Sequence, residues 1–159
     1  MSRDEKFQST AQAMGYSFDG EIKVGGNYTS TVRDGRVVYL SGQVPRVGST
    51  VVVTGRAGEA VDLEGARLGA RICAMRALAL LKQSLGSLDA VERIAKVNVY
   101  VQSAADFNQQ SEVADAASDL LQAILGPSGV HTRTSVGVFQ LPKNATVELD
   151  LIAIASESA

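Results

Sequence analysis

The sequence predicts one α/β domain of the α+β type, a mixed sheet with two long helices on one face. The first observation is size, because a chain of 159 residues has about the length of one ordinary domain. The second is a pair of long stretches with apolar residues at helical spacing, and the third is a set of β-rich runs. No repeat or linker interrupts the predicted order β-β-(β)-α-β-α-β-β.

The N-terminal region, residues 1–24, is predicted to be an arm with a short, weak helix over Asp4 to Met14, and residues 25–159 form the domain itself. The β pattern starts with residues 28–32 and 37–42. Between these runs stands Asp34-Gly35, a strong signal for a two-residue hairpin, because both turn positions need positive φ. Residues 51–53 could add a short strand.

Residues 63–85 predict a long helix, with Asp62 as N-cap and Gly86 just past its end. Small apolar residues recur on one side of this helix at spacings of three and four. Its basic residues Arg67, Arg71 and Arg76 are interpreted as a solvated face.

Residues 94–101 alternate apolar and polar side chains, as a half-buried strand does. A second helix is expected to start at Ser103, which has capping-box spacing to Asp106, and to end at Gly126-Pro127. Two final strands, residues 132–139 and 146–155, complete the pattern.

Crossover rules tend to place both helices on one face, so the other sheet face has no cover within the chain. Subunit packing is the expected cover, because the strands are rich in apolar residues. The residues behind this expectation are Val38, Leu40, Val136, Val138, Val147 and Leu149. An aromatic content of 5% without tryptophan also favours burial against other copies.

Composition excludes several function classes. The single cysteine, Cys73, rules out an internal disulfide and indicates a reducing, cytoplasmic location. The single histidine, His131, disfavours metal sites and Ser-His or Cys-His chemistry. A net charge of -2 without a basic cluster disfavours nucleic acid. No segment predicts a signal peptide or a membrane-spanning helix.

Two charged residues in the C-terminal strands could carry chemistry. Arg133 lies in a β-rich run, where its guanidinium could bind a carboxylate in bidentate fashion. It could equally pair with Glu148 or Asp150, or lie on an exposed strand face. Glu148 shares a strand face with Asp150 and could orient or deprotonate a water, or simply belong to the polar side of an edge strand.

Several segments together resemble the Rid/YjgF family of reactive intermediate deaminases, in order and spacing. They are Gly26-Asn27-Tyr28, Ser41-Gly42-Gln43-Val44-Pro45, Arg133-Thr134-Ser135-Val136-Gly137-Val138 and Leu141-Pro142 with the strand from Val147 to Ala153. The resemblance runs from about Gly25 to Ala155 and is strongest to a longer branch with an N-terminal arm.

The resemblance implies a chorismate-mutase-like fold assembled as a homotrimer, with active sites in clefts between subunits and no cofactor. Members with the full motif hydrolyse 2-enamines or 2-imines to 2-oxo acids and ammonia. By the same resemblance Arg133 would hold the substrate carboxylate and Glu148 would position the attacking water, with Tyr28 and Ser41 near the pocket. Ser135, expected to contact substrate, replaces a cysteine of many active members, and Gly137 replaces a larger residue.

Two other functions stay open from the sequence. The first is a non-catalytic trimer that binds small carboxylate metabolites as a sensor or scaffold. The second is ribonuclease activity, which the acidic balance of the chain disfavours.

Overall fold

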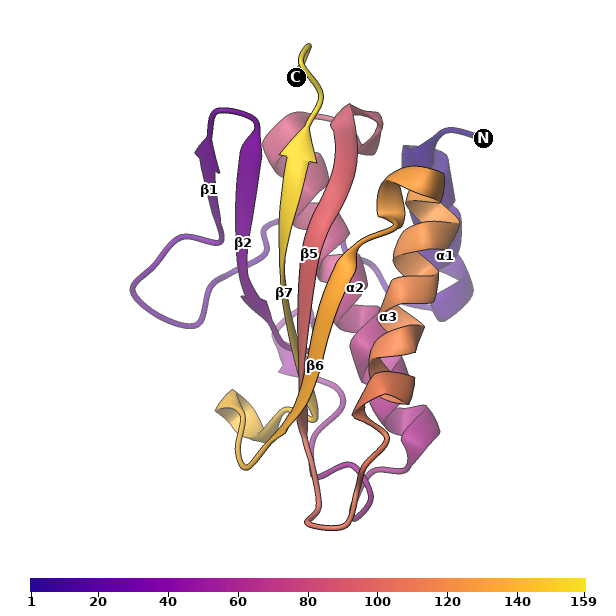
Figure 1. Cartoon of the computed structure of the whole chain (residues 1–159), viewed down its shortest axis with the longest axis vertical. Helices are drawn as coiled ribbons and strands as arrows, with labels where there is room; N and C mark the ends of the chain where they lie inside the picture. Colours follow the sequence, from indigo (N-terminus) through magenta and orange to yellow (C-terminus); the bar gives the residue numbers. More distant parts are fainter.

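The computed structural model describes residues 1–159, and its centre is a five-stranded mixed sheet (Figure 1). The strands lie in the order β1-β2-β7-β5-β6, and only β5 and β6 run parallel to each other. Their bounds are β1 Thr31–Asp34, β2 Val37–Gln43, β5 Val91–Gln102, β6 Thr132–Val138 and β7 Val147–Ala155. Strands β3 Arg46–Val47 and β4 Thr50–Val51 form a separate small hairpin.

Two long helices, α2 Leu63–Leu85 and α3 Gln110–Leu125, pack against this sheet, and the N-terminal helix α1 Arg3–Met14 packs against both of them. Short 3-10 turns cover Leu88–Ala90, Gly126–Gly129 and Pro142–Asn144. The long helices α2 and α3 contact each other and the same sheet face, whose residues Val99 and Leu149 are fully buried. The prediction of a mixed sheet with two long helices on one face is therefore confirmed.

The predicted hairpin is confirmed as the pair β1 and β2. Asp34 pairs with Val37, so the turn residues are Gly35 and Arg36, one position later than the Asp-Gly pair indicated. Gly35 has a φ of 61°, which glycine adopts at little cost.

The predicted helix over residues 63–85 is confirmed with both of its ends. The Asp62 side chain accepts a hydrogen bond from the Gly65 amide, and Gly86 ends α2 in the left-handed region. The predicted start of the second helix is wrong. The Ser103 hydroxyl donates to the Val101 carbonyl at 2.8 Å instead of capping a helix, and α3 begins only at Gln110.

The uncovered sheet face exists and includes the expected Val136, but four of the other expected residues do not lie on it. Val38, Leu40, Val147 and Leu149 are at most 5% exposed and lie on the helix side. The large apolar side chains exposed on the open face are Val32, Tyr39 and Val136. Strand alternation identified two faces correctly but could not tell which one the helices cover.

The N-terminal arm packs into the common core. Phe7 on α1 is 2% exposed and Phe18 is 6% exposed, with their ring centroids 6.4 Å apart. Ser2 and Glu5 form a reciprocal capping box at the start of α1. The predicted boundary at residue 24 stays a prediction.

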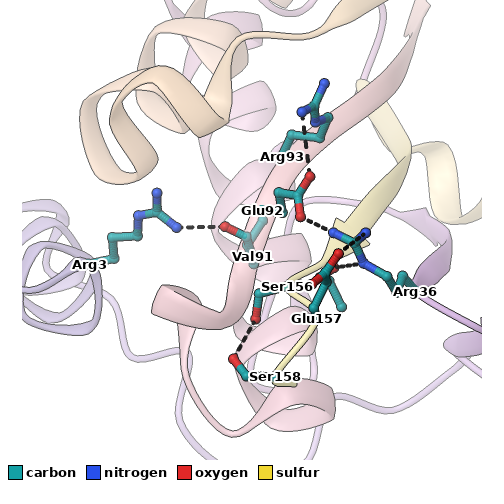
Figure 2. Close-up of polar contacts among 9 residues, drawn as sticks. Arg3, Arg36, Val91, Glu92, Arg93, Ser156, Glu157 and Ser158 are labelled. Carbon is teal, nitrogen blue, oxygen red and sulfur yellow. Dashed lines mark hydrogen bonds and ion pairs between the residues drawn. The ribbon is translucent and has the colours of Figure 1, made fainter.

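Polar contacts hold the N-terminal arm against the start of β5 (Figure 2). Arg3 Nη1 donates to the Val91 carbonyl at 2.7 Å. On the following residue, the Glu92 carboxylate lies between Arg36 and Arg93 and pairs with both.

No helix of the structure is both long enough and apolar enough to cross a membrane.

Candidate functional site

A cavity of about 220 Å³ lies where β2 and β7 meet the N-terminal arm and α2. Its lining includes Tyr28, Gly42, Arg46, Arg76, Lys143 and Glu148. One acidic side chain therefore shares a small pocket with several cationic ones. The pocket combines a possible proton acceptor with groups that attract anions.

A bulge in β2 builds the wall of this pocket. Leu40 pairs with Leu151 and Gln43 with Leu149, so β2 carries one extra residue across this interval. The bulge brings Gly42 against the Glu148 carboxylate. A Cβ added at Gly42 would lie 2.9 Å from Glu148 Cδ, so only glycine leaves the carboxylate undisturbed.

The pKa of Glu148 is raised, chiefly by burial and secondly by the charge of Asp150. Asp150 itself accepts a hydrogen bond from Asn98 Nδ2 at 2.8 Å. Glu148 takes part in none of the ion pairs of the structure. A raised pKa makes this carboxylate a better proton acceptor than an exposed glutamate.

The loop that carries Lys143 is held by a buried amide. Gln102 is fully buried, accepts from the Leu141 amide and donates to Asn144 Oδ1, both at 2.7 Å. Lys143 and Asn144 adopt φ values of 60° and 57°, which side-chain-bearing residues seldom do. These bonds keep the loop at the pocket in a conformation that it would not choose by itself.

Arg133 lies on the helix side of β6, away from this pocket. It pairs with the buried Val97 of β5, and its Nη1 donates to Asp115 Oδ1 at 2.8 Å and to Ser118 Oγ at 3.0 Å. The sequence left open that Arg133 forms an ion pair with Glu148 or Asp150. The structure has an ion pair, but its acidic partner is Asp115. Because Glu148 faces the open side, Arg133 and Glu148 of one chain lie on opposite faces of the sheet.

His131, just before β6, contacts the α3 residue Ser118 in the same cluster. Its Nε2 lies 2.8 Å from Ser118 Oγ and its Nδ1 lies 2.6 Å from the Gly129 carbonyl oxygen. Both ring nitrogens are thus occupied by contacts within the chain. The Ser-His contact positions Ser118 beside Arg133, and neither residue lines the cavity that contains Glu148.

The other candidate residues are divided between the two locations. Tyr28, 54% exposed, lines the same pocket as Glu148. Ser41 precedes the pocket residue Gly42, and its hydroxyl lies 3.3 Å from Nε2 of the pocket residue Gln43. Ser135 follows Arg133 on the helix side of β6, opposite Val99.

Sequence reasoning missed Arg76 as a pocket residue, and its assignment to a solvated face is wrong. Arg76 is 6% exposed; its Nε donates to Gln43 Oε1 at 3.2 Å and its Nη1 to the Arg46 carbonyl at 2.9 Å. Its neighbours on the helix face, Ile72 and Ala79, are also buried. That apolar spacing was a signal that the arginine belongs to a buried row.

Cys73 is buried and its thiol contacts the Val147 carbonyl at 3.7 Å. Burial raises the pKa of this thiol, so it stays protonated and serves as packing. No three His, Cys, Asp or Glu side chains lie together in a way that could hold a metal ion.

The sheet, the helix pair and the small charged pocket define an α/β protein whose pocket places one carboxyl group among several cationic side chains. Residues 19–155 match the family model described as Endoribonuclease L-PSP. The chain therefore belongs to this family, which is the YjgF/Rid family recognised in its sequence motifs.

Two relatives and one solved structure show how near the similarity is. Protein TCP17 of Trypanosoma cruzi is 37% identical over 142 residues, covering 89% of each chain. A 2-iminobutanoate/2-iminopropanoate deaminase of Dermatophagoides farinae is 29% identical over 130 residues, covering 81% of this chain and 86% of the relative. The crystal structure of Atu1372 from Agrobacterium tumefaciens, a protein of unknown function, superposes with a TM-score of 0.86 at 33% identity, covering 96% and 94%.

Proposed function

We propose that the protein hydrolyses 2-imino and 2-enamino acids to 2-oxo acids and ammonia. The observation that carries this proposal is Glu148, a carboxyl group with raised pKa for which Gly42 leaves room in a cationic pocket. A relative named as a deaminase of 2-iminobutanoate and 2-iminopropanoate supports the same chemistry. Membership of the YjgF/Rid family is consistent with it.

The reaction needs one oriented water and one group that moves a proton. The substrate nitrogen is protonated, so the imine carbon is electrophilic without further activation. The water oxygen forms a bond to this carbon as the C=N π bond breaks, and Glu148 accepts a proton from the water. The product of this step is a neutral carbinolamine. Glu148 then returns the proton to the nitrogen. As the C–N bond breaks, the Glu148 carboxylate takes up the hydroxyl proton, so the carbonyl of the 2-oxo acid forms and ammonia leaves; Glu148 finally gives this proton to the ammonia.

A second copy of the chain is needed if Arg133 is to hold the substrate carboxylate. Within one chain Arg133 lies on the helix side of the edge strand β6, whereas Glu148 faces the open side. The exposed apolar residues Val32, Tyr39 and Val136 give the open face a surface for such packing. We therefore infer a homotrimer whose clefts combine Arg133 and Ser135 with Tyr28, Ser41 and Glu148.

The test is hydrolysis of 2-iminopropionate or 2-iminobutyrate generated in the cuvette. We expect the wild-type chain to accelerate 2-oxo acid formation over buffer, and Glu148→Gln to abolish the acceleration while the protein stays folded. Wild-type protein that is no faster than buffer would overturn the proposal. Saturable binding of 2-oxo acids without turnover would instead identify a non-catalytic carboxylate-binding protein.

A further inference from the structure

Two arginines meet at the Glu148 pocket without an acidic partner. Arg76 is 6% exposed, and neither it nor Arg46 takes part in any ion pair of the structure. The charge of Arg46 lowers the pKa of Arg76 further, after burial, so the two guanidinium groups are close enough to repel. Burying a guanidinium is costly unless an opposite charge neutralises it.

The bonds that these arginines do make are to neutral oxygens. Arg76 uses its Nε and Nη1 on the Gln43 side-chain oxygen and the Arg46 carbonyl, and its Nη2 makes no hydrogen bond. The Nε of Arg46 is buried and has no hydrogen-bond partner at all. Both side chains therefore have hydrogen-bond donors at the cavity wall that bind no group of the chain.

The side chains that line the Glu148 cavity carry more positive than negative charge. Lys23 and Lys143 also line it, so four cations face the single carboxylate of Glu148. On the other side of the arginines, a second cavity of about 320 Å³ carries Asp19 and Glu21. Neither of these acids forms an ion pair with Arg46 or Arg76.

We propose that Arg46 and Arg76 form an anion subsite within one chain that binds a second acidic group of the substrate. The substrate class is then dicarboxylic 2-imino acids, and the products are 2-oxo dicarboxylic acids. This inference rests on the proposed imine hydrolysis at Glu148. A single carboxylate would leave most of the positive charge of the pocket uncompensated, whereas a dianion meets both the reacting end and the arginine pair.

The first experiment compares binding of two product-like ligands by calorimetry, 2-oxoglutarate with two carboxylates and 2-oxobutyrate with one. We expect 2-oxoglutarate to bind at least about tenfold more tightly, the effect of one desolvated charge-assisted contact. The preference should fall to near unity in Arg76→Met. The matched control is Arg71→Met, which removes the same charge from the same helix at a position outside the cavity lining.

Arg46→Met tests the subsite independently if Arg76→Met does not fold, since Arg46 lies outside the long helices. Retention of the dicarboxylate preference in Arg46→Met, or its loss in Arg71→Met, would overturn the subsite. Equal binding of the two ligands to the wild-type chain would do so too. Competition by inorganic phosphate as strong as by 2-oxoglutarate would show a general anion site and would also overturn the dicarboxylate assignment.

Turnover separates this inference from the proposed function. Hydrolysis of 2-iminobutyrate without any preference for dicarboxylates would remove the subsite and leave the activity intact. Tight dicarboxylate binding without hydrolysis of any imine would remove the activity and leave the subsite.

Discussion

The substitution Gly42→Ala tests the geometry of the Glu148 pocket most directly. The new Cβ would lie 2.9 Å from Glu148 Cδ and 3.0 Å from its Oε2, whereas ordinary contact begins at 3.4 Å. The carboxylate must therefore move by about half an ångström. A displacement of about 1 Å can cost about a hundredfold in rate, so we expect a loss of about tenfold in kcat.

The fold should tolerate the same change. The group that must move is the end of a flexible side chain, and Gly42 is not among the residues with positive φ. The free energy of unfolding should fall by less than about 1 kcal/mol. Gly25→Ala is the matched control, because Gly25 lines the same cavity and an added Cβ there meets nothing within 4 Å.

Steady-state hydrolysis of 2-iminobutyrate and chemical denaturation measure the two effects separately. The reasoning would be refuted if Gly42→Ala kept full activity, or if Gly25→Ala lost as much. A large loss of stability in Gly42→Ala alone would show that the backbone, rather than Glu148, absorbs the contact.

Three further predictions concern charge and packing. Asp150→Asn removes a charge that raises the pKa of Glu148, so the acid limb of the kcat/KM profile should move to lower pH, and an unmoved limb would exclude Glu148 as the titrating base. A double-mutant cycle on Arg133 and Asp115, 20% and 54% exposed as side chains, should give a coupling of about 0.5 kcal/mol in denaturation, and a coupling of several kcal/mol would contradict their solvent exposure. Phe7→Ala should lower the free energy of unfolding by about 3–5 kcal/mol, since this ring is 2% exposed in the core, and a loss below about 1 kcal/mol would mean that α1 is dispensable for folding.

Local signals in the sequence were sufficient for most of the fold. The caps at Asp62 and Gly86 and the turn at Gly35 are decided by a few neighbouring residues, and α2 and the first hairpin lie where these signals predict. The start of α3 was predicted wrongly because the Ser103 hydroxyl donates to the Val101 carbonyl, near the end of β5, and does not cap a helix.

The candidate site could be predicted only in part. Tyr28 and Glu148 do line one cavity, but the side of the sheet on which Arg133 lies depends on α3, whose Asp115 binds it. The burial of Arg76 could be read from its apolar neighbours on α2, but its contacts could not, because they are made to residues far away in sequence. Its guanidinium reaches Gln43 and the Arg46 carbonyl, and no pattern within α2 reports that contact.

The bulge in β2 has a consequence for how this pocket could arise or be lost. Along a regular strand, side chains alternate between the two faces, so residues three positions apart point to opposite faces. Leu40 and Gln43 are three positions apart, yet both face the helix side because the strand carries an extra residue between them, and from this side Gln43 reaches Arg76. If the same residues were paired without the bulge, Gln43 would face the open side and lose its contact with Arg76, so this wall of the pocket depends on a single irregular position.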